Sequence, residues 1–293
     1  MLVITNPSAG RGRGRQAQAA LQGYWRTQGL APAIQTPGSV AELRSLVREA
    51  PAKGYLGVVV VGGDGTFHAV INAAHGLEIP LGLIPAGGGN DIARALGIPL
   101  DAVEAAHVLG RARVRRMDAI HVRAATGGEA LFAGAGGAGL DAEAARLANT
   151  RFRKVPGLGR YVAAAVAAFR GARPMQVRLE ADGIEQTFPA HLVAVANSPS
   201  YGNGVQIAPE ASPFDGWMDV AMVAPLRWQQ LLDGLMLALR GADIRWPEMR
   251  RLRARCVRLH TDRPVIFHGD GEVLGETPVE LELLPGALPV LVP

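Results

Sequence analysis

The 293-residue chain is poor in cysteine and in aromatic residues, and it has no long apolar run. Its one cysteine, Cys256, can form no disulfide within the chain. Aromatic residues make up only 5% of the sequence, which leaves few surfaces for base stacking and argues against nucleic-acid binding. The longest uncharged apolar stretch with a helical pattern, Tyr161–Phe169, is far shorter than the roughly 20 residues of a membrane-spanning helix. We therefore expect no transmembrane segment. The sequence starts as a strand and a turn rather than as a leader, so we expect a cytoplasmic protein.

Lysine is also nearly absent, and positive charge is carried by arginine. The 30 basic residues outnumber 26 acidic ones, for a net charge of +4, and only Lys53 and Lys154 are lysines. A mild positive balance suits phosphates or an anionic membrane surface. Apolar residues make up 48% of the chain, enough for a sizeable core, and the length predicts about two domains.

The first third of the chain alternates apolar runs with helical patterns. The runs read as buried strands: Leu2–Thr5, Ala33–Thr36, Leu56–Val61 and Leu81–Ile84. A helical pattern follows each of them: Arg15–Gln28, Val40–Glu49, Thr66–Ala74 and Asp91–Leu96. This alternation predicts a parallel sheet covered by helices, with ligands beyond the carboxyl ends of its strands.

The pattern changes after about Met117. The following segments read as antiparallel strands: Gln176–Glu180, His191–Ala196, Val257–His260 and Val265–His268. Few helices interrupt them, notably Gly159–Arg170 and Trp228–Leu239. We therefore predict an α/β domain over residues 1–117, with 284–293 as a candidate addition, and a β-rich, sandwich-like domain over 118–283.

Glycine is abundant and clustered after the strands of the first domain. Gly62-Gly63-Asp64-Gly65-Thr66 follows a run of four valines and opens a helix. Glycines let a backbone approach a ligand closely, and a helix N-terminus favours phosphate. Asp64 would repel phosphate, so it either organises the loop or partners a bound cation. The simpler interpretation is a tight turn with Asp64 as the helix cap.

Two further loops extend this pattern. Pro85–Asp91 carries three successive glycines one strand later, although Asn90 or Asp91 could simply cap the next helix. Asn6–Arg11 follows the first strand and adds a cation. No P-loop, nucleophile elbow or His-Glu-x-x-His motif is present. Gly134–Gly139 matches a dinucleotide fingerprint, but the acidic residue expected about 20 positions later is missing.

Taken together, the motifs resemble the diacylglycerol kinase catalytic-domain family of bacterial lipid kinases, which are related to sphingosine and ceramide kinases. The resemblance covers nearly the whole chain. It rests on Asn6-Pro7 with Gly10, Gly62–Thr66, Pro85–Arg94, Gly139–Ala142, Asp215–Asp219 and Asp270–Glu272.

The resemblance implies a nucleotide domain and a lipid domain with the active site in the cleft between them. It implies ATP-dependent phosphorylation of a lipid hydroxyl, with ATP and Mg²⁺ as cofactors, by a protein that contacts the inner membrane surface peripherally. The positions expected to bind ATP are Asn6, Gly10, Arg11, Thr36, Gly62, Gly63, Asp64, Gly65, Thr66, Phe67, His68, Gly87, Gly88 and Asn90. The chain departs from the family at Gly88, where Thr or Ser is usual, and at Ala69, where Glu is common.

For the metal, the resemblance implies Mg²⁺ held by the Asp215 side chain and the carbonyls of Ser212 and Trp217, whereas the residues alone favour an Asp-Gly turn. For the base, it places a catalytic acid pair at Asp270 and Glu272. The residues alone indicate a hairpin turn at Asp270-Gly271, but in an extended segment the two carboxylates would face the same side. We expect Asp270 to take the hydroxyl proton and Glu272 to orient it or to pair with Arg11, with Glu272 as the alternative proton acceptor.

Two other functions stay open at this point. One is a soluble-substrate kinase of the NAD kinase or phosphofructokinase type, and the other is a catalytically silent nucleotide- or lipid-binding module. The residues do not identify the lipid or the oligomeric state, and a homodimer is compatible with them. A basic–apolar segment is a candidate membrane contact, with a solvated helix flank as the equal alternative: Arg151, Phe152, Arg153, Lys154, Val155, Leu158 and Arg160.

Overall fold

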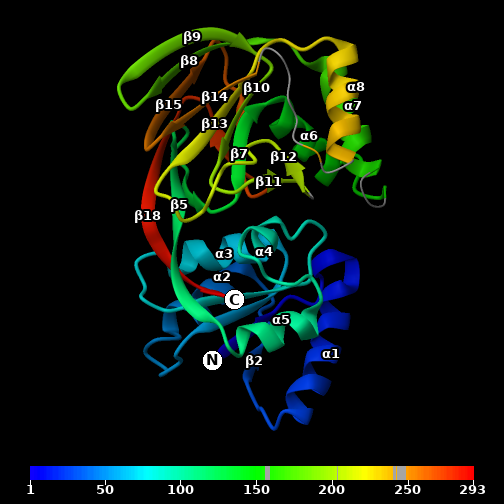
Figure 1. Ribbon diagram of the computed structural model, residues 1–293, viewed down its shortest axis with the longest axis vertical. Coiled ribbons are helices and arrows are strands. Elements are labelled where there is room, and N and C mark those ends of the chain that lie inside the picture. The colour runs from blue at the N-terminus through cyan, green and yellow to red at the C-terminus, as the bar shows by residue number, and fades with distance from the viewer. Residues whose placement is uncertain (156–158, 203, 240–241, 243–248) are drawn as a thin grey trace. The chain divides into compact units, whose positions relative to one another are not determined.

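The computed structural model describes residues 1–155, 159–202, 204–239, 242 and 249–293 (Figure 1). The chain divides into two compact units. The first comprises Met1–Asp118 together with Pro285–Pro293, and the second comprises Ala119–Leu284.

The first unit is built on a parallel sheet. Its strands are β1 (Leu2–Thr5), β2 (Ala33–Gln35), β3 (Val58–Gly62) and β4 (Leu81–Pro85), in the order β2-β1-β3-β4. The last part of β18 (Val279–Val292) pairs in parallel with β4, with Val290 opposite Leu81. Every residue of β1, β3 and β4 is buried, which explains their continuous apolar runs, since helices cover both faces of such a sheet.

Helices follow the strands of this sheet in turn. They are α1 (Arg13–Thr27), α2 (Val40–Glu49), α3 (Asp64–Ala74), α4 (Asp91–Ala95) and α5 (Ala102–Leu109), with a 3₁₀ turn, η1 (Ala9–Gly12), before α1. The chain steps from β1 to β2 in one direction and from β2 through β3 to β4 in the other. Right-handed crossovers therefore place α1 on one face and α2 and α3 on the opposite face (Figure 1).

The second unit contains two sheets. One holds β5 (Arg113–Ala124), β6 (Glu129–Phe132), β8 (Met175–Ala181), β9 (Ile184–Ala190), β15 (Cys256–Thr261) and the first part of β18. The other has the order β14-β13-β10-β7-β16-β17. Its strands are β7 (Ala135–Gly139), β10 (Leu192–Ala196), β13 (Met218–Val223), β14 (Met249–Ala254), β16 (Ile266–Gly269) and β17 (Glu272–Glu276). A short pair, β11 (Ser200–Tyr201) and β12 (Val205–Gln206), stands apart.

Side-chain alternation along β10 shows how these layers stack. Val193 and Val195 belong to the core between the two sheets, whereas Ala194 and Ala196 face a second core beneath the helices. That second core includes residues of α6 (Leu140–Asn149), α7 (Gly159–Gly171) and α8 (Trp228–Leu239). The predicted fold class, a parallel α/β unit followed by a β-rich sandwich-like unit, is confirmed. No helix in the described ranges is long and apolar enough to cross a membrane.

The dinucleotide-like stretch has a structural explanation. Residues 135–139 form β7, between β10 and β16. A Cβ on Gly136 would lie 2.1 Å from the His268 carbonyl oxygen, and one on Gly137 would lie 2.5 Å from the Val193 carbonyl oxygen. These glycines therefore allow close strand packing and do not form a phosphate loop.

Candidate active site

Three loops predicted from the sequence meet at the carboxyl edge of the first sheet. Because α1 and α3 leave neighbouring strands towards opposite faces, the edge between β1 and β3 is a topological switch point, where open α/β sheets bind ligands. Asn6 follows β1 there, and its amide nitrogen donates a hydrogen bond of 2.9 Å to the Thr66 hydroxyl in the first turn of α3. The first two loops are thus joined across the switch point.

Glycines bring the backbones of these loops into direct contact. A Cβ on Gly63 would lie 2.8 Å from the Gly87 Cα, and one on Gly87 would lie 2.5 Å from the Gly63 Cα. Gly10 has a φ of +56°, and a Cβ there would lie 2.3 Å from the Ala86 carbonyl oxygen. The loops form one continuous backbone surface beside the N-terminus of α3, where phosphate is favoured.

Asn90 and Asp64 hold this surface in shape. The Asn90 side chain, in a residue only 8% exposed, accepts the Gly87 N–H at 2.8 Å and donates to the Gly87 carbonyl at 3.3 Å. Asp64 Oδ1 accepts the Ile92 N–H at 3.1 Å. Of the roles left open for Asp64, this contact supports that of loop organiser.

The remaining residues predicted to bind the nucleotide differ in which of their backbone and side-chain groups are exposed. The Thr36 hydroxyl lies 2.7 Å from that of Thr5, at the end of β2. The Phe67 side chain is fully buried, so only its backbone is available to a nucleotide. His68 is half-buried, and its carbonyl accepts a hydrogen bond from Asn72. Gly65 and Arg11 are exposed.

Arg13 is a further candidate, although no sequence motif marks it. Its guanidinium donates to the Gly87 carbonyl at 3.1 Å, which brings a positive charge from α1 to the third loop. Gly88, by contrast, faces open space: nothing lies within 4 Å of a Cβ built there. A Cβ at this position would therefore displace no neighbour.

In the second unit, Asp270 and Gly271 form the two-residue turn between β16 and β17. Their φ values are +53° and +86°, as the hairpin interpretation requires. The expectation that Asp270 and Glu272 lie in one extended segment is wrong, because the chain reverses between them. The Asp270 carboxylate accepts the N–H groups of Ala133 at 3.0 Å and Gly134 at 2.8 Å, and Glu272 is exposed at the start of β17.

A buried pair of ionisable side chains, His268 and Asp141, lies at the strand that leads into this hairpin. His268 Nε2 lies 3.0 Å from Asp141 Oδ2, and both side chains are at most 5% exposed. His268 stands in β16, two residues before Asp270, and Asp141 is in the first turn of α6. Asp141 lies within the motif Gly139–Ala142, but nothing in the sequence indicates His268 as its partner.

Ser212, Asp215 and Trp217, the predicted magnesium ligands, share one turn. The Trp217 N–H donates to Asp215 Oδ1 at 3.1 Å, and Arg253 Nη2 lies 3.4 Å from Asp215 Oδ2. The same guanidinium lies 3.3 Å from Asp219, so one positive charge faces two carboxylates. Burial raises the pKa of Asp219 against the effect of Arg253.

These oxygens suit a hydrated divalent cation. The buried Asp219 Oδ2 has no hydrogen-bond partner within the described part of the chain, and Asp219 shares Arg253 with Asp215. Asp215 is exposed, which lets waters complete the coordination shell that carbonyls and a single carboxylate leave open. No cluster of three His, Cys, Asp or Glu side chains is found among the residues that the structure describes.

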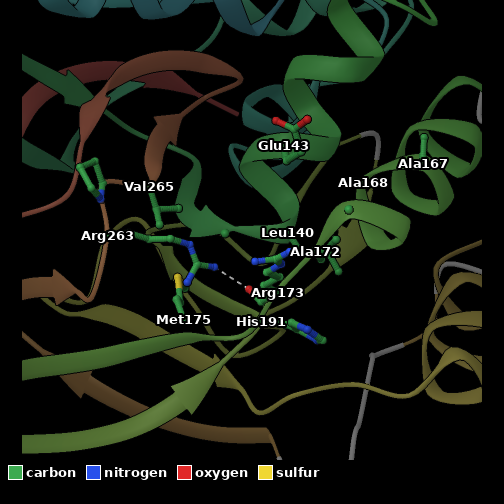
Figure 2. A pocket seen from close by; sticks show the side chains of 13 residues that line it. Leu140, Glu143, Ala167, Ala168, Ala172, Arg173, Met175, His191, Arg263 and Val265 are labelled. Atoms are coloured by element: carbon green, nitrogen blue, oxygen red, sulfur yellow. Dashed lines mark hydrogen bonds between the residues drawn. The ribbon is translucent and has the colours of Figure 1, made fainter.

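A cavity of about 300 Å³ lies within the second unit, beside the start of α6 and the end of α7 (Figure 2). Most of its wall is apolar: Leu140, Ala167, Ala168, Ala172, Met175, Pro264 and Val265. Arg173 and Arg263 also line it, and the Arg263 guanidinium donates to the Arg173 carbonyl at 2.7 Å. Glu143 completes the polar part of the wall, so the cavity presents both apolar and charged side chains.

His191 borders the same cavity. Its Nδ1 accepts the Leu226 N–H at 2.8 Å, and burial lowers the pKa of the imidazole. Of the basic–apolar segment considered as a membrane contact, Arg151, Arg153 and Lys154 are exposed, and Leu158 lies outside the described residues.

Comparison with known proteins agrees with this arrangement. Residues 1–122 match the diacylglycerol kinase catalytic domain, and residues 134–292 match the YegS C-terminal NAD kinase beta sandwich-like domain. A diacylglycerol kinase of Mycobacterium tuberculosis is 32% identical over 99% of this chain and 94% of its own length. A "Probable lipid kinase YegS-like" protein of Stenotrophomonas maltophilia is 28% identical over 100% of this chain and 95% of its own.

Solved structures share the fold. A crystal structure of a diacylglycerol kinase from Bacillus anthracis str. Sterne covers 100% of this chain and 96% of its own, with a TM-score of 0.74 at 22% identity. The matched family models and the curated relatives identify the protein as a kinase. The chain belongs to the family of diacylglycerol kinases and YegS-like lipid kinases.

Proposed function

We propose that the protein transfers the γ-phosphate of ATP to the hydroxyl of a diacylglycerol-like lipid. The observation that carries the proposal is the backbone surface where Gly10, Gly63 and Gly87 approach their neighbours without side chains. Such a surface at a switch point and a helix N-terminus is suited to a nucleotide's phosphates. The names of the curated relatives support a lipid acceptor.

In this proposal the first unit binds and orients the nucleotide. Asn90 and Asp64 keep the loops in shape, and Thr66 is held by Asn6. Arg11 and Arg13 add positive charge near the phosphates. When bound, ATP supplies the phosphoryl group, and Mg²⁺ neutralises phosphate charge. Ser212, Asp215 and Trp217 in the second unit are the proposed ligands of a structural Mg²⁺, whose role is to position the active site.

Asp270 is the proposed base. Two backbone N–H groups fix its carboxylate, one on each oxygen. An ionised carboxylate has about four acceptor sites, and in this proposal the one held here accepts the proton of a lipid hydroxyl. A base positioned in this way is worth about 10²–10⁴-fold in rate. Glu272, exposed next to the turn, is its proposed partner.

The test compares Asp270→Asn and Glu272→Gln with a matched control, Asp182→Asn. Asp182 also begins an Asp-Gly turn with positive φ, between β8 and β9, and its carboxylate also accepts backbone N–H groups, from Arg255 and Cys256. We expect Asp270→Asn to lose about 10²–10⁴-fold in turnover with ATP affinity kept, and Asp182→Asn to retain turnover. Equal turnover in all three variants and the wild type would show that Asp270-Gly271 is a structural turn without a catalytic role.

The assay itself separates the alternative functions. Labelled γ-phosphate from ATP is offered with a lipid panel and, separately, with soluble metabolites. Label in a lipid supports the proposal, and label only in a soluble product supports a kinase of the NAD kinase type. No transfer to either, with ATP still bound, supports a silent binding module. Because a lipid hydroxyl lies at a bilayer interface, the proposal also implies peripheral contact with a membrane, at the cytoplasmic face.

A further inference from the structure

Helix α8 exposes an apolar stripe that no described element covers. Trp228, Leu232 and Met236 are 45%, 52% and 50% exposed, and their spacing of four residues places them on one side of the helix. Leu231 and Leu235 face the other way, into the core beneath the helices. The polar residues Gln229 and Asp233 are also exposed and lie on the helix surface next to the stripe.

Arginines flank the stripe at its N-terminal end. The Trp228 ring stacks edge-on against Phe169 of α7, with centroids 4.6 Å apart, so the end of α7 lies beside the start of α8 (Figure 1). Arg170 follows Phe169, Arg173 lies three residues further on, and Arg227 precedes Trp228; all three are exposed. Within the described ranges, none of their guanidinium groups forms a hydrogen bond or an ion pair.

We propose that this stripe, Trp228, Leu232 and Met236 with the three arginines, is the surface by which the protein docks on an anionic membrane. Trp suits the boundary between headgroups and acyl chains, and half-exposed Leu and Met gain by entering the apolar layer. Unpaired arginines attract anionic headgroups. The inference rests on the proposed lipid substrate, which requires such a contact, and it replaces the segment around Arg151 as the candidate surface.

A second copy of the chain is a poorer occupant. A two-fold interface places the same patch against itself, and this patch carries three arginines but one carboxylate, Asp233, so a second copy brings the same excess of positive charge. An anionic bilayer offers partners both to the apolar stripe and to the arginines.

The experiment measures binding of the full-length protein to sedimented vesicles without ATP. Vesicles of phosphatidylcholine with phosphatidylglycerol are compared with phosphatidylcholine alone. The stripe variants are Leu232→Glu and the milder Met236→Gln, which keeps side-chain size and helix propensity. The matched control is Ile184→Glu, because Ile184 is 67% exposed in β9 of the same unit but is not part of the stripe. Thermal unfolding checks that each variant is folded.

We expect Leu232→Glu to lower vesicle binding about tenfold, Met236→Gln to lower it less, and Ile184→Glu to leave it unchanged. Replacing the three arginines by Gln should remove the preference for anionic vesicles. Equal binding by the wild type and both stripe variants would overturn the proposal. So would a wild-type dimer that Leu232→Glu dissociates while vesicle binding stays the same.

Kinase assays on detergent-solubilised diacylglycerol separate this inference from the proposed function. Leu232→Glu should keep the wild-type rate there, because micelles remove the need to dock on a bilayer. If the wild type phosphorylates no lipid in micelles yet binds anionic vesicles through the stripe, the proposed function fails and the docking surface stands. If it phosphorylates the lipid but the stripe variants bind vesicles normally, the docking surface fails alone.

Discussion

The contact between Gly63 and Gly87 allows a sharp test of the nucleotide surface through Gly87→Ala. The new methyl group would lie 2.5 Å from the Gly63 Cα, whereas ordinary contacts begin at 3.4 Å. The Gly63 Cα is a backbone atom and the new Cβ is fixed to the backbone at position 87, so neither can rotate away, and the two loops must separate by about 0.9 Å. Misplacement of about 1 Å in a catalytic site can cost about 10²-fold in rate.

We therefore expect Gly87→Ala to lower ATP-dependent turnover about 10²-fold, with a destabilisation of about 1–3 kcal/mol from overpacking. Turnover and ATP affinity are measured by phosphoryl transfer and calorimetry, and stability by thermal unfolding. The matched control is Gly23→Ala, an identical change in α1 at an exposed position where nothing lies within 4 Å. It should stabilise the protein by about 0.5–1 kcal/mol and leave ATP affinity unchanged. Normal ATP affinity and turnover in Gly87→Ala would refute the role of the glycine contact.

Three further changes test other parts of the structure. Gly88→Thr introduces a hydroxyl into open space and should tighten ATP binding roughly two- to tenfold, measured by calorimetry. Asp215→Ala should weaken Mg²⁺ binding in a direct titration, and unaltered affinity would remove the turn at 212–217 as the metal site. Because burial lowers the folded-state pKa of His191, its contribution to stability is present above the ordinary value of 6.5 and is lost as pH falls below it. The thermal midpoint of His191→Gln should therefore fall less between pH 7 and pH 5 than that of the wild type, and parallel curves would contradict this.

The first unit was largely predictable because its signals are local. Buried parallel strands read as continuous apolar runs, and β1 and α2 have the bounds that the sequence predicts. Gly63 and Gly87 were identified because a glycine cluster after such a strand has few explanations other than close approach of backbones. The predicted helix at Thr66 begins two residues earlier, at Asp64.

Contacts between distant segments were not predictable. Arg13 reaches Gly87 across 74 positions of sequence, and nothing near Arg13 distinguishes it from the other arginines of that loop and helix. His268 and Asp141 are 127 positions apart, and each alone reads as an ordinary polar residue. At Asp270 the local signal for a hairpin was correct, and the extended geometry inferred from carboxylate spacing was wrong, because positive φ at Asp270 and Gly271 reverses the chain.

The path of β18 has a consequence for biosynthesis. Leu81, in β4 of the first sheet, pairs with Val290 of β18, and Pro285–Pro293 belong to the first unit. While the ribosome adds the residues between 118 and 285, β4 lacks this neighbour, and its edge offers unpaired N–H and C=O groups. At about 5–20 residues per second, that interval lasts roughly 10–30 s. The unit whose synthesis begins first is therefore completed last. During this interval the glycine loops of the nascent chain lie at the edge of a sheet that lacks the β18 segment.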